Sequence, residues 1–169
     1  EDERNLRKSI LFGDPESLVV GWSVPKDQAL IQRTGRKLLQ LLKLNKGINV
    51  CLNLQGSKLE DFFAEIPEMN PFKDVIKATP FDPHDADMYA HLDALFIDPE
   101  SEPFSGITRR ALMAGILPMA PKSLVADELL NNGKHGIIYS DMDNSALFEK
   151  AIDRSFLASF RAESQEYIG

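Results

Sequence analysis

The sequence has 169 residues and a mass of 18.9 kDa, the size of one domain. Apolar residues make up 43% and charged residues 27%, a balance that excludes wholesale disorder. The formal charge is −7 without a clustered basic stripe, which argues against a nucleic-acid partner. One cysteine and three histidines argue against a dedicated zinc site. No apolar run reaches the roughly 18 residues that cross a bilayer and no signal peptide opens the chain, so we expect a cytoplasmic domain without a transmembrane segment.

Short apolar runs alternate with helix-like stretches along the chain. Strands are expected at 18–21, 48–54, 75–76, 94–97, 116–120 and 136–139. Helices are expected at 27–44, 57–66, 85–91, 106–114 and 123–132, with one last long helix from 143. Gly35 destabilises the helix expected at 27–44 by about 1 kcal/mol relative to Ala, which favours a helix that starts after this glycine. Ser57 with Glu60 indicates a capping box at the second.

The alternation predicts the fold class. Strands this short and apolar suit a parallel sheet covered by helices on both faces. We therefore expect an α/β, Rossmann-like three-layer domain of about six parallel strands that occupies residues 1–169. Cys51 lies in an apolar run and is expected to be a buried structural thiol.

Ligands of such folds bind beyond the carboxyl ends of the strands, where the strand order reverses. The loop from Asp98 to Thr108 contains several carboxylates and opens onto a helix N-terminus, whose free amides and dipole favour an anion such as a diphosphate. Glu102 would accept hydrogen bonds from sugar hydroxyls, and Arg109 and Arg110 would neutralise phosphate if they face the crevice. The other interpretation is a solvated acidic loop that caps an ordinary helix.

A longer stretch around this loop favours the ligand site over the solvated loop. It comprises residues 94–120, ALFIDPESEPFSGITRRALMAGILPMA. The stretch resembles the donor-site signature of GT-B-fold glycosyltransferases, above all the retaining family 4. The residues that fall in register with that signature are Glu102, Pro103, Phe104, Ala111, Ala114, Gly115, Pro118 and Ala120. Residues 128–138 and 89–96 extend the likeness, which covers about residues 6 to 160.

The resemblance implies the C-terminal half of a two-domain enzyme. This half would bind a nucleotide-sugar, with no other cofactor and no obligatory metal, while a separate N-terminal domain, absent from this sequence, would bring the acceptor. Glu102 would be the catalytic carboxylate that contacts the donor sugar, and the amides of Phe104, Ser105 and Gly106 would hold the diphosphate. Gly56 would lie beside the nucleotide and Thr79 near the base.

Some positions depart from the family pattern. Arg110 replaces the second glutamate of the Glu-x7-Glu motif, and an arginine cannot accept hydrogen bonds from ribose. Trp22 stands where the family has an arginine, and it would either stack on the base or sugar or pack against the first helix. Asp27 replaces a lysine, for which Lys26 would substitute. Ser105 stands where the motif has a glycine, and the glycine comes one position later, at Gly106. Such cations stabilise a leaving diphosphate, so their loss bears on activity.

Three functions follow. The first is the donor-binding domain of a retaining glycosyltransferase that transfers a hexose to an acceptor, inactive as an isolated domain and located in the cytoplasm, with a peripheral membrane contact through the missing domain left open. The second is a catalytically degenerate, glycosyltransferase-like binding or scaffold subunit. The third is a different nucleotide-binding α/β domain, such as a sugar-nucleotide epimerase of the same fold, which would need a functional histidine, His84 or His91, near Glu102.

Overall fold

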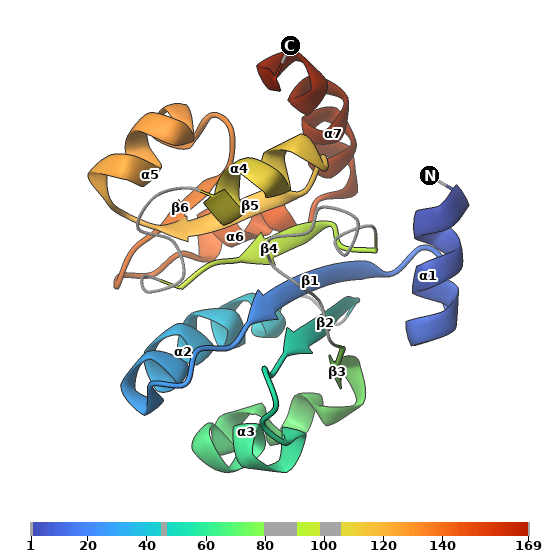
Figure 1. Ribbon diagram of the computed structural model, residues 1–169, viewed down its shortest axis with the longest axis vertical. Coiled ribbons are helices and arrows are strands. Elements are labelled where there is room, and N and C mark those ends of the chain that lie inside the picture. The colour runs from blue at the N-terminus through green and yellow to red at the C-terminus, as the bar shows by residue number, and fades with distance from the viewer. Residues whose placement is uncertain (1, 45–46, 80–90, 99–105, 169) are drawn as a thin grey trace.

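The computed structural model describes residues 2–44, 47–79, 91–98 and 106–168, which form a six-stranded parallel sheet between helices (Figure 1). The strands are β1 (Leu18–Ser23), β2 (Ile48–Asn53), β3 (Ile76–Ala78), β4 (Ala94–Phe96), β5 (Leu117–Pro121) and β6 (Ile137–Tyr139). The α-helices are α1 (Asp2–Phe12), α2 (Gln28–Leu44), α3 (Leu59–Glu65), α4 (Gly106–Met113), α5 (Leu124–Leu129), α6 (Ser145–Ala151) and α7 (Arg154–Ile168). Two 3-10 helices, η1 (Pro67–Val75) and η3 (Asn131–Gly133), complete the described part.

The strand order, β3-β2-β1-β4-β5-β6, confirms the predicted Rossmann-like α/β fold. Strand β1 pairs with β2 over six residues and with β4 on its other side. The chain therefore builds the sheet outward from β1 in one direction, returns to β4, and continues in the opposite direction. In an open parallel sheet this reversal leaves a crevice at the carboxyl ends of the two central strands, β1 and β4.

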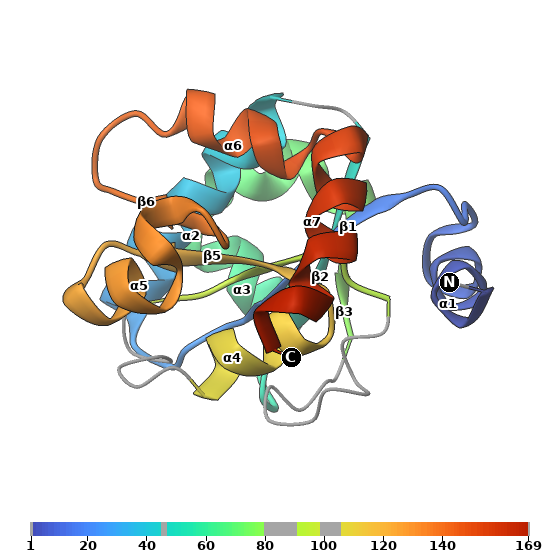
Figure 2. The same cartoon turned by 90° about the horizontal axis from the view of Figure 1, so that it is seen from above.

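Helices cover both faces of the sheet. Figure 1 shows α4, α5 and α7 on one side of the sheet and α2 and α3 on the other. Seen from above, α6 lies near α2, and the two helices are in contact (Figure 2). All six residues of β1 are buried, because helices pack over both of its faces. Because both faces of the sheet are covered, the strand sequences are continuous apolar runs rather than alternations of apolar and polar residues.

Helix α2 runs through Gly35, so the expectation that it starts after this glycine is wrong. The reason is a close approach between elements that are distant in sequence. A Cβ atom at position 35 would lie 2.1 Å from Cδ1 of Ile66, the residue between α3 and η1. Glycine is therefore used to bring α2 against this segment, and burial of the surrounding side chains compensates for its low helix propensity.

Helix boundaries differ from the sequence expectations at two further places. The expected last long helix is two helices, α6 and α7, and the Asp153 carboxylate caps the second by accepting a hydrogen bond from the Phe156 amide at 2.9 Å. The capping box at Ser57 and Glu60 is also wrong. Helix α3 begins at Leu59, and its N-cap residue, Lys58, makes no side-chain capping bond.

The helix expected at 85–91 falls outside the described residues apart from its last one. Helix α1 was not expected from the sequence. It precedes β1 and lies at the amino end of that strand (Figure 1). None of the helices within the described ranges combines the length and apolar character that crossing a bilayer requires.

Candidate functional site

The loops that follow β1 and β2 form a hollow of about 450 Å³ between α2 and α3. Lys26, Gln55 and Gly56 line it together with apolar residues such as Ile31 and Phe62. The Gln55 amide donates hydrogen bonds to Ser23 Oγ at 3.2 Å and to the Val24 carbonyl at 3.0 Å, which ties the two loops together. The hollow therefore lies at the carboxyl edge of the sheet, where this fold class binds ligands.

The turn after β2 requires a glycine at its second position. Gln55 has φ of 53° and Gly56 has φ of 94°, both in the left-handed region. A Cβ atom at Gly56 would meet nothing within 4 Å, so the backbone conformation rather than lack of space selects glycine. The result is a backbone segment exposed to the hollow, which fits the sequence expectation that Gly56 lies beside a ligand.

Lys26 and Asp27 have different local roles. Lys26 is exposed at the hollow, where its ammonium is available to an anion. Asp27 caps α2: its Oδ1 accepts a hydrogen bond from the Leu30 amide at 3.0 Å, and its carbonyl accepts one from Ile31 at 3.0 Å. The aspartate that replaces the family's lysine is thus explained by helix capping.

The N-terminus of α4 adds a second polar element. Gly106 is the exposed first residue of this eight-residue helix, which follows β4 in the chain. A Cβ atom at Gly106 would lie 3.7 Å from Nη1 of Arg110, so the Arg110 guanidinium turns back over the first turn of α4. Backbone amides, the helix dipole and a guanidinium meet at this point, a combination that favours a bound anion.

Thr79 immediately follows β3 and is half-buried at the same edge. Its amide donates to the Leu52 carbonyl at 2.8 Å, and its hydroxyl lies 3.7 Å from Cys51 Sγ. Burial raises the pKa of the Cys51 thiol to about 11, so it stays neutral. The expectation of a buried structural cysteine is confirmed, and Thr79 extends the carboxyl edge toward the end of the sheet.

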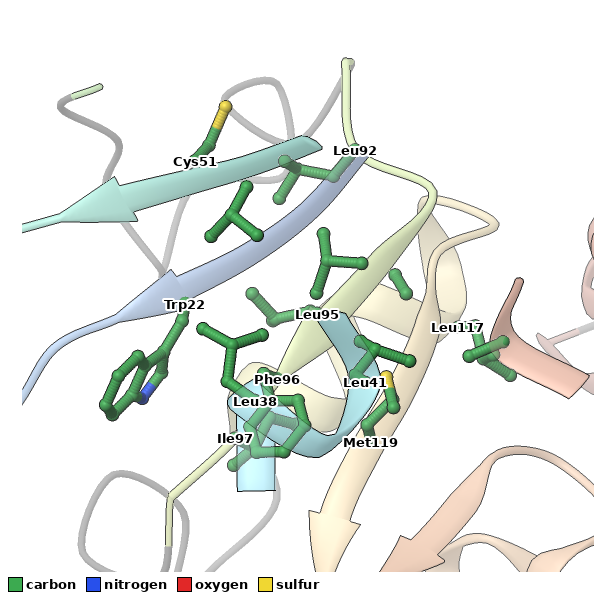
Figure 3. Packing of buried hydrophobic residues seen from close by; sticks show 14 of the residues in the cluster. Trp22, Leu38, Leu41, Cys51, Leu92, Leu95, Phe96, Ile97, Leu117 and Met119 are labelled. Carbon is green, nitrogen blue, oxygen red and sulfur yellow. The ribbon is translucent and has the colours of Figure 1, made fainter. Parts of the chain in front are cut away.

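Trp22 does not belong to the site, which corrects one of the two interpretations of this residue. Its side chain has no exposed surface. The indole packs edge-on against Phe62 with ring centroids 6.0 Å apart, and its Cη2 lies 3.9 Å from where a Cβ of Gly35 would be. Figure 3 shows it in the core beside Leu38 of α2. A ring enclosed in this way has no face left for a base or sugar.

His91 is also far from the crevice. It precedes β4 and so lies at the amino edge of the sheet, opposite the loops described above. Only 6% of its surface is exposed. Burial lowers its pKa to about 4, and nearby Arg7, Arg4 and Lys8 contribute. His91 therefore does not lie at the crevice, where the epimerase hypothesis needs a histidine.

Glu102, Phe104, Ser105 and His84 lie outside the described residues. The described candidates, Lys26, Gly56, Thr79, Gly106 and Arg110, follow the carboxyl ends of four different strands or their helices, which the strand order places along one edge. No group of three or more His, Cys, Asp or Glu residues in the described ranges has the geometry to hold a metal ion.

The sequence also contains candidates that we did not predict. Gln55 lies in a strand-to-helix loop, where ligands of this fold class bind, but no role was predicted for this residue itself. Thr34 and Lys37 were overlooked as well. Their three-residue spacing places them on one flank of α2, where both are buried.

Comparison with known protein families finds no match to the sequence, and comparison with curated proteins finds none either. Solved structures do match. The Anabaena protein Alr3699/HepE, in complex with UDP and glucose, superposes with a TM-score of 0.74 at 17% identity over 99% of this chain. In its complex with UDP-glucose the same protein gives a TM-score of 0.71 at 18% identity. These superpositions cover 47% and 48% of the HepE chain, so this chain spans about half of that protein's length.

Two further structures have the same arrangement. A TarM mutant from S. aureus, in complex with fondaparinux, alpha-GlcNAc-glycerol and UDP, matches with a TM-score of 0.70 at 12% identity, over 90% of this chain and 32% of TarM. The glycosyltransferase SnogD from Streptomyces nogalater matches with a TM-score of 0.55 at 14% identity, over 89% of this chain and 39% of SnogD. Together with the sheet order and the sequence signature, these similarities show that the chain has the Rossmann-like fold of one half of a GT-B glycosyltransferase.

Proposed function

We propose that the chain is the C-terminal, donor-binding part of a retaining glycosyltransferase that transfers a hexose from a nucleoside diphosphate sugar to an acceptor. The observation that carries this proposal is the position of α4. Its exposed N-terminus follows β4, one of the two strands that flank the reversal of the sheet, and the Arg110 guanidinium folds over it. The HepE and TarM structures of the same fold contain UDP.

The diphosphate would bind against the Gly106 amide at the N-terminus of α4. Arg110 would neutralise part of its charge, and Lys26 would approach from the loop after β1. A guanidinium near the helix N-terminus compensates for the arginine and lysine that the family pattern places after the first strand, because what a leaving diphosphate needs is positive charge rather than a particular side chain. Gly56 and Thr79 would contact the nucleoside.

Glu102 would contact the donor sugar as the catalytic carboxylate, with Phe104 and Ser105 contributing amides to the same diphosphate site. The acceptor would be brought by an N-terminal domain outside this sequence, as expected for a chain that spans about half of HepE. The chemistry proposed for these residues needs no metal, since amides and cations supply the charge stabilisation.

Titration of the protein with UDP and UDP-glucose, followed by calorimetry, tests donor binding. Replacing Arg110 with Gln is expected to weaken UDP binding about tenfold, because a charge-assisted hydrogen bond to phosphate is lost. Lys26→Gln is expected to weaken it about threefold, because this lysine is exposed to solvent. The matched control is Lys150→Gln, an exposed lysine on α6. Absence of binding at millimolar UDP, or equal affinities in all variants, contradicts the proposal.

A second candidate, a binding or scaffold subunit without catalysis, is favoured by the residues after β1. The two positions where the family pattern has cations hold a buried core residue, Trp22, and a helix cap, Asp27. The two candidates differ in the full-length protein. Glu102→Gln abolishes glycosyl transfer and the cellular role of an enzyme, whereas the role of a scaffold survives this substitution.

A further inference from the structure

A second cavity lies at the carboxyl edge of the sheet, on the other flank of α2 from the donor site. It has a volume of about 310 Å³ and is formed by α2 and by the residues at and after the ends of β5 and β6. It shares no lining residue with the hollow around Lys26 and Gly56. Gln28 and Ile31 face that hollow, whereas Arg33, Thr34 and Lys37 face this cavity, as the 100° step of an α-helix requires.

The lining of this cavity is positively charged, although the whole chain carries a formal charge of −7. Arg33, Lys37 and Lys122 line it against a single carboxylate, Asp141. Arg33 pairs with Asp141 at 3.0 Å, and both side chains are largely exposed. Lys122 pairs with Asp127 at 3.2 Å and is also exposed. These two surface pairs leave the third cation, Lys37, without a counter-charge.

Lys37 is unusual because it is buried and has no partner. Only 7% of its surface is exposed, and no hydrogen bond or ion pair joins it to another residue of the described ranges. The stem of a lysine is often buried while its head group reaches solvent, and Lys37 has a buried stem beside a cavity that other cations also line.

Hydroxyl groups complete the lining. Thr34 and Ser140 line the cavity, and so does Tyr139, whose hydroxyl donates a hydrogen bond to the Ile97 carbonyl at the end of β4. Burial, with the nearby Asp98 carboxylate, raises the pKa of Tyr139, so its hydroxyl stays neutral and its proton stays directed at the Ile97 carbonyl. An ammonium group beside the Thr34 and Ser140 hydroxyls is suited to an oxyanion such as a phosphoryl group.

We propose that this cavity is a second anion site, in which the Lys37 ammonium binds the phosphoryl group of a small phosphorylated molecule. The volume exceeds that of a phosphate ion, so a phosphorylated sugar fits the cavity as well as inorganic phosphate does. The site lies on the same edge of the sheet as the donor site and is separated from it by α2. It does not depend on the proposed donor function, because the two sites use different residues.

The test titrates the protein with inorganic phosphate and, in a separate arm, with glucose 6-phosphate, and follows the amide NMR signals of Thr34 and Ser140. Both signals are expected to shift and saturate in the millimolar range. Tighter binding of glucose 6-phosphate identifies a sugar phosphate as the ligand class, and equal affinities identify the phosphoryl group alone. Lys37→Met is expected to lower the affinity for both probes at least about tenfold. Lys43→Met, an exposed lysine in the last turn of α2, is the matched control and leaves both affinities unchanged.

Folding of the variant is monitored in the same experiment. Because Lys37→Met removes one of three cations that line the same cavity and keeps the length of the side chain, its melting temperature without phosphate is expected to equal or exceed that of the wild type. Phosphate raises the melting temperature of the wild type but not that of the variant. If phosphate produces no saturable shift, or shifts the signals equally in Lys37→Met, the proposal is wrong. It is also wrong if Lys37→Met weakens UDP binding as strongly as phosphate binding while Lys26→Gln has no effect on UDP, because Lys37 would then belong to the donor site.

Discussion

The two edges of the sheet treat buried charge in opposite ways. At the amino edge, Asp93 is 4% exposed and its carboxylate accepts hydrogen bonds from Lys8 at 2.7 Å, from the Val19 amide at 2.9 Å and from Arg161 at 2.9 Å. These contacts join α1, β1 and α7 to the strand that follows, β4. Burial lowers the pKa of Lys8, and the Asp93 charge acts in the opposite direction.

At the carboxyl edge, two lysines have no such partner among the described residues. Lys37 is 7% exposed and unpaired, and Lys26 lies open at its hollow. A buried charge that is paired, such as Asp93, has a structural role, because its contacts hold elements of the fold together. A cation at a cavity without a counter-charge is instead explained by a ligand. The comparison therefore assigns the amino edge to structure, whereas the carboxyl edge is the one for which we propose ligand binding.

The largest expected effect is at the amino edge. Replacing Asp93 with Asn keeps the size of the side chain but leaves Lys8 buried without a counter-charge, so we expect a loss of about 3–5 kcal/mol in the free energy of unfolding, measured by chemical denaturation. Glu3→Gln is the control, because the exposed pair of Glu3 with Arg7 on α1 is worth less than about 0.5 kcal/mol. If Asp93→Asn costs no more than this control, the amino edge is not a structural network.

Gly35→Ala is expected to have the second-largest effect on stability. We expect it to lower the free energy of unfolding by about 3 kcal/mol, the upper end of the range for overpacked cores. The new Cβ would lie 2.1 Å from Ile66 Cδ1, so the buried Ile66 side chain, or the backbone of α2 or of the segment around Ile66, must shift. Because both cavities of the carboxyl edge are lined by α2, phosphate and UDP binding should weaken along with stability.

Ile66→Val removes the clashing methyl group and supplies the control. In a double-mutant cycle, Gly35→Ala in the Ile66→Val background is expected to cost clearly less than in the wild type. Additive effects of the two substitutions would show that the glycine is required for some other reason than this contact.

Much of the fold could be predicted from the sequence, since apolar runs mark strands that are buried on both faces. The same property explains the error at Trp22. Gly21 and Trp22 point to opposite sides of β1, but where both faces are covered, alternation does not tell which side chain reaches a ligand. The helix start at Gly35 was mispredicted because the cause is a contact with Ile66, 31 positions later, which no local propensity contains.

From the sequence, candidate site residues could be predicted only where they directly follow a strand, because ligands of this fold class bind beyond the carboxyl ends of the strands. Lys26, Gly56, Thr79 and Gly106 were implied by the family resemblance, and all of them follow the carboxyl end of a strand in the chain. By the same rule His91, which precedes β4, belonged to the opposite edge, so this error was avoidable. Lys37 could not be found by this rule, because it reaches its cavity from inside a helix.

The pH dependence of stability sharpens the comparison at the amino edge. The pKa of His91 is about 4 in the folded protein and 6.5 without the fold. The unfolded chain therefore takes up a proton first as the pH falls, so the stability due to neutral His91 is complete above pH 6.5 and is lost between about 6.5 and 4. Burial and the neighbouring Arg7, Arg4 and Lys8 hold this pKa down, and Asp93 opposes them.

Denaturation at pH 7.5 and pH 5 measures this effect. We expect the wild type to lose about 2 kcal/mol more than a His91→Gln variant between these values. Parallel losses in both proteins would mean that His91 is protonated in the folded state, and the amino edge would then tolerate an added charge as the carboxyl edge does.

The smallest expected effects come from the aspartates that cap a helix at each edge, Asp27 of α2 and Asp153 of α7. Asn caps a helix about as well as Asp, so Asp27→Asn and Asp153→Asn should each change the free energy of unfolding by less than about 0.5 kcal/mol. At the carboxyl edge, however, the substitution also removes a negative charge beside Lys26, and UDP affinity should rise about threefold in calorimetry. At the amino edge it should leave UDP affinity unchanged. A charge next to an anion site acts on the bound anion, whereas the same charge at the far end of the helices is screened by distance and solvent. An equal response of UDP affinity to the two substitutions would therefore remove the electrostatic distinction between the edges.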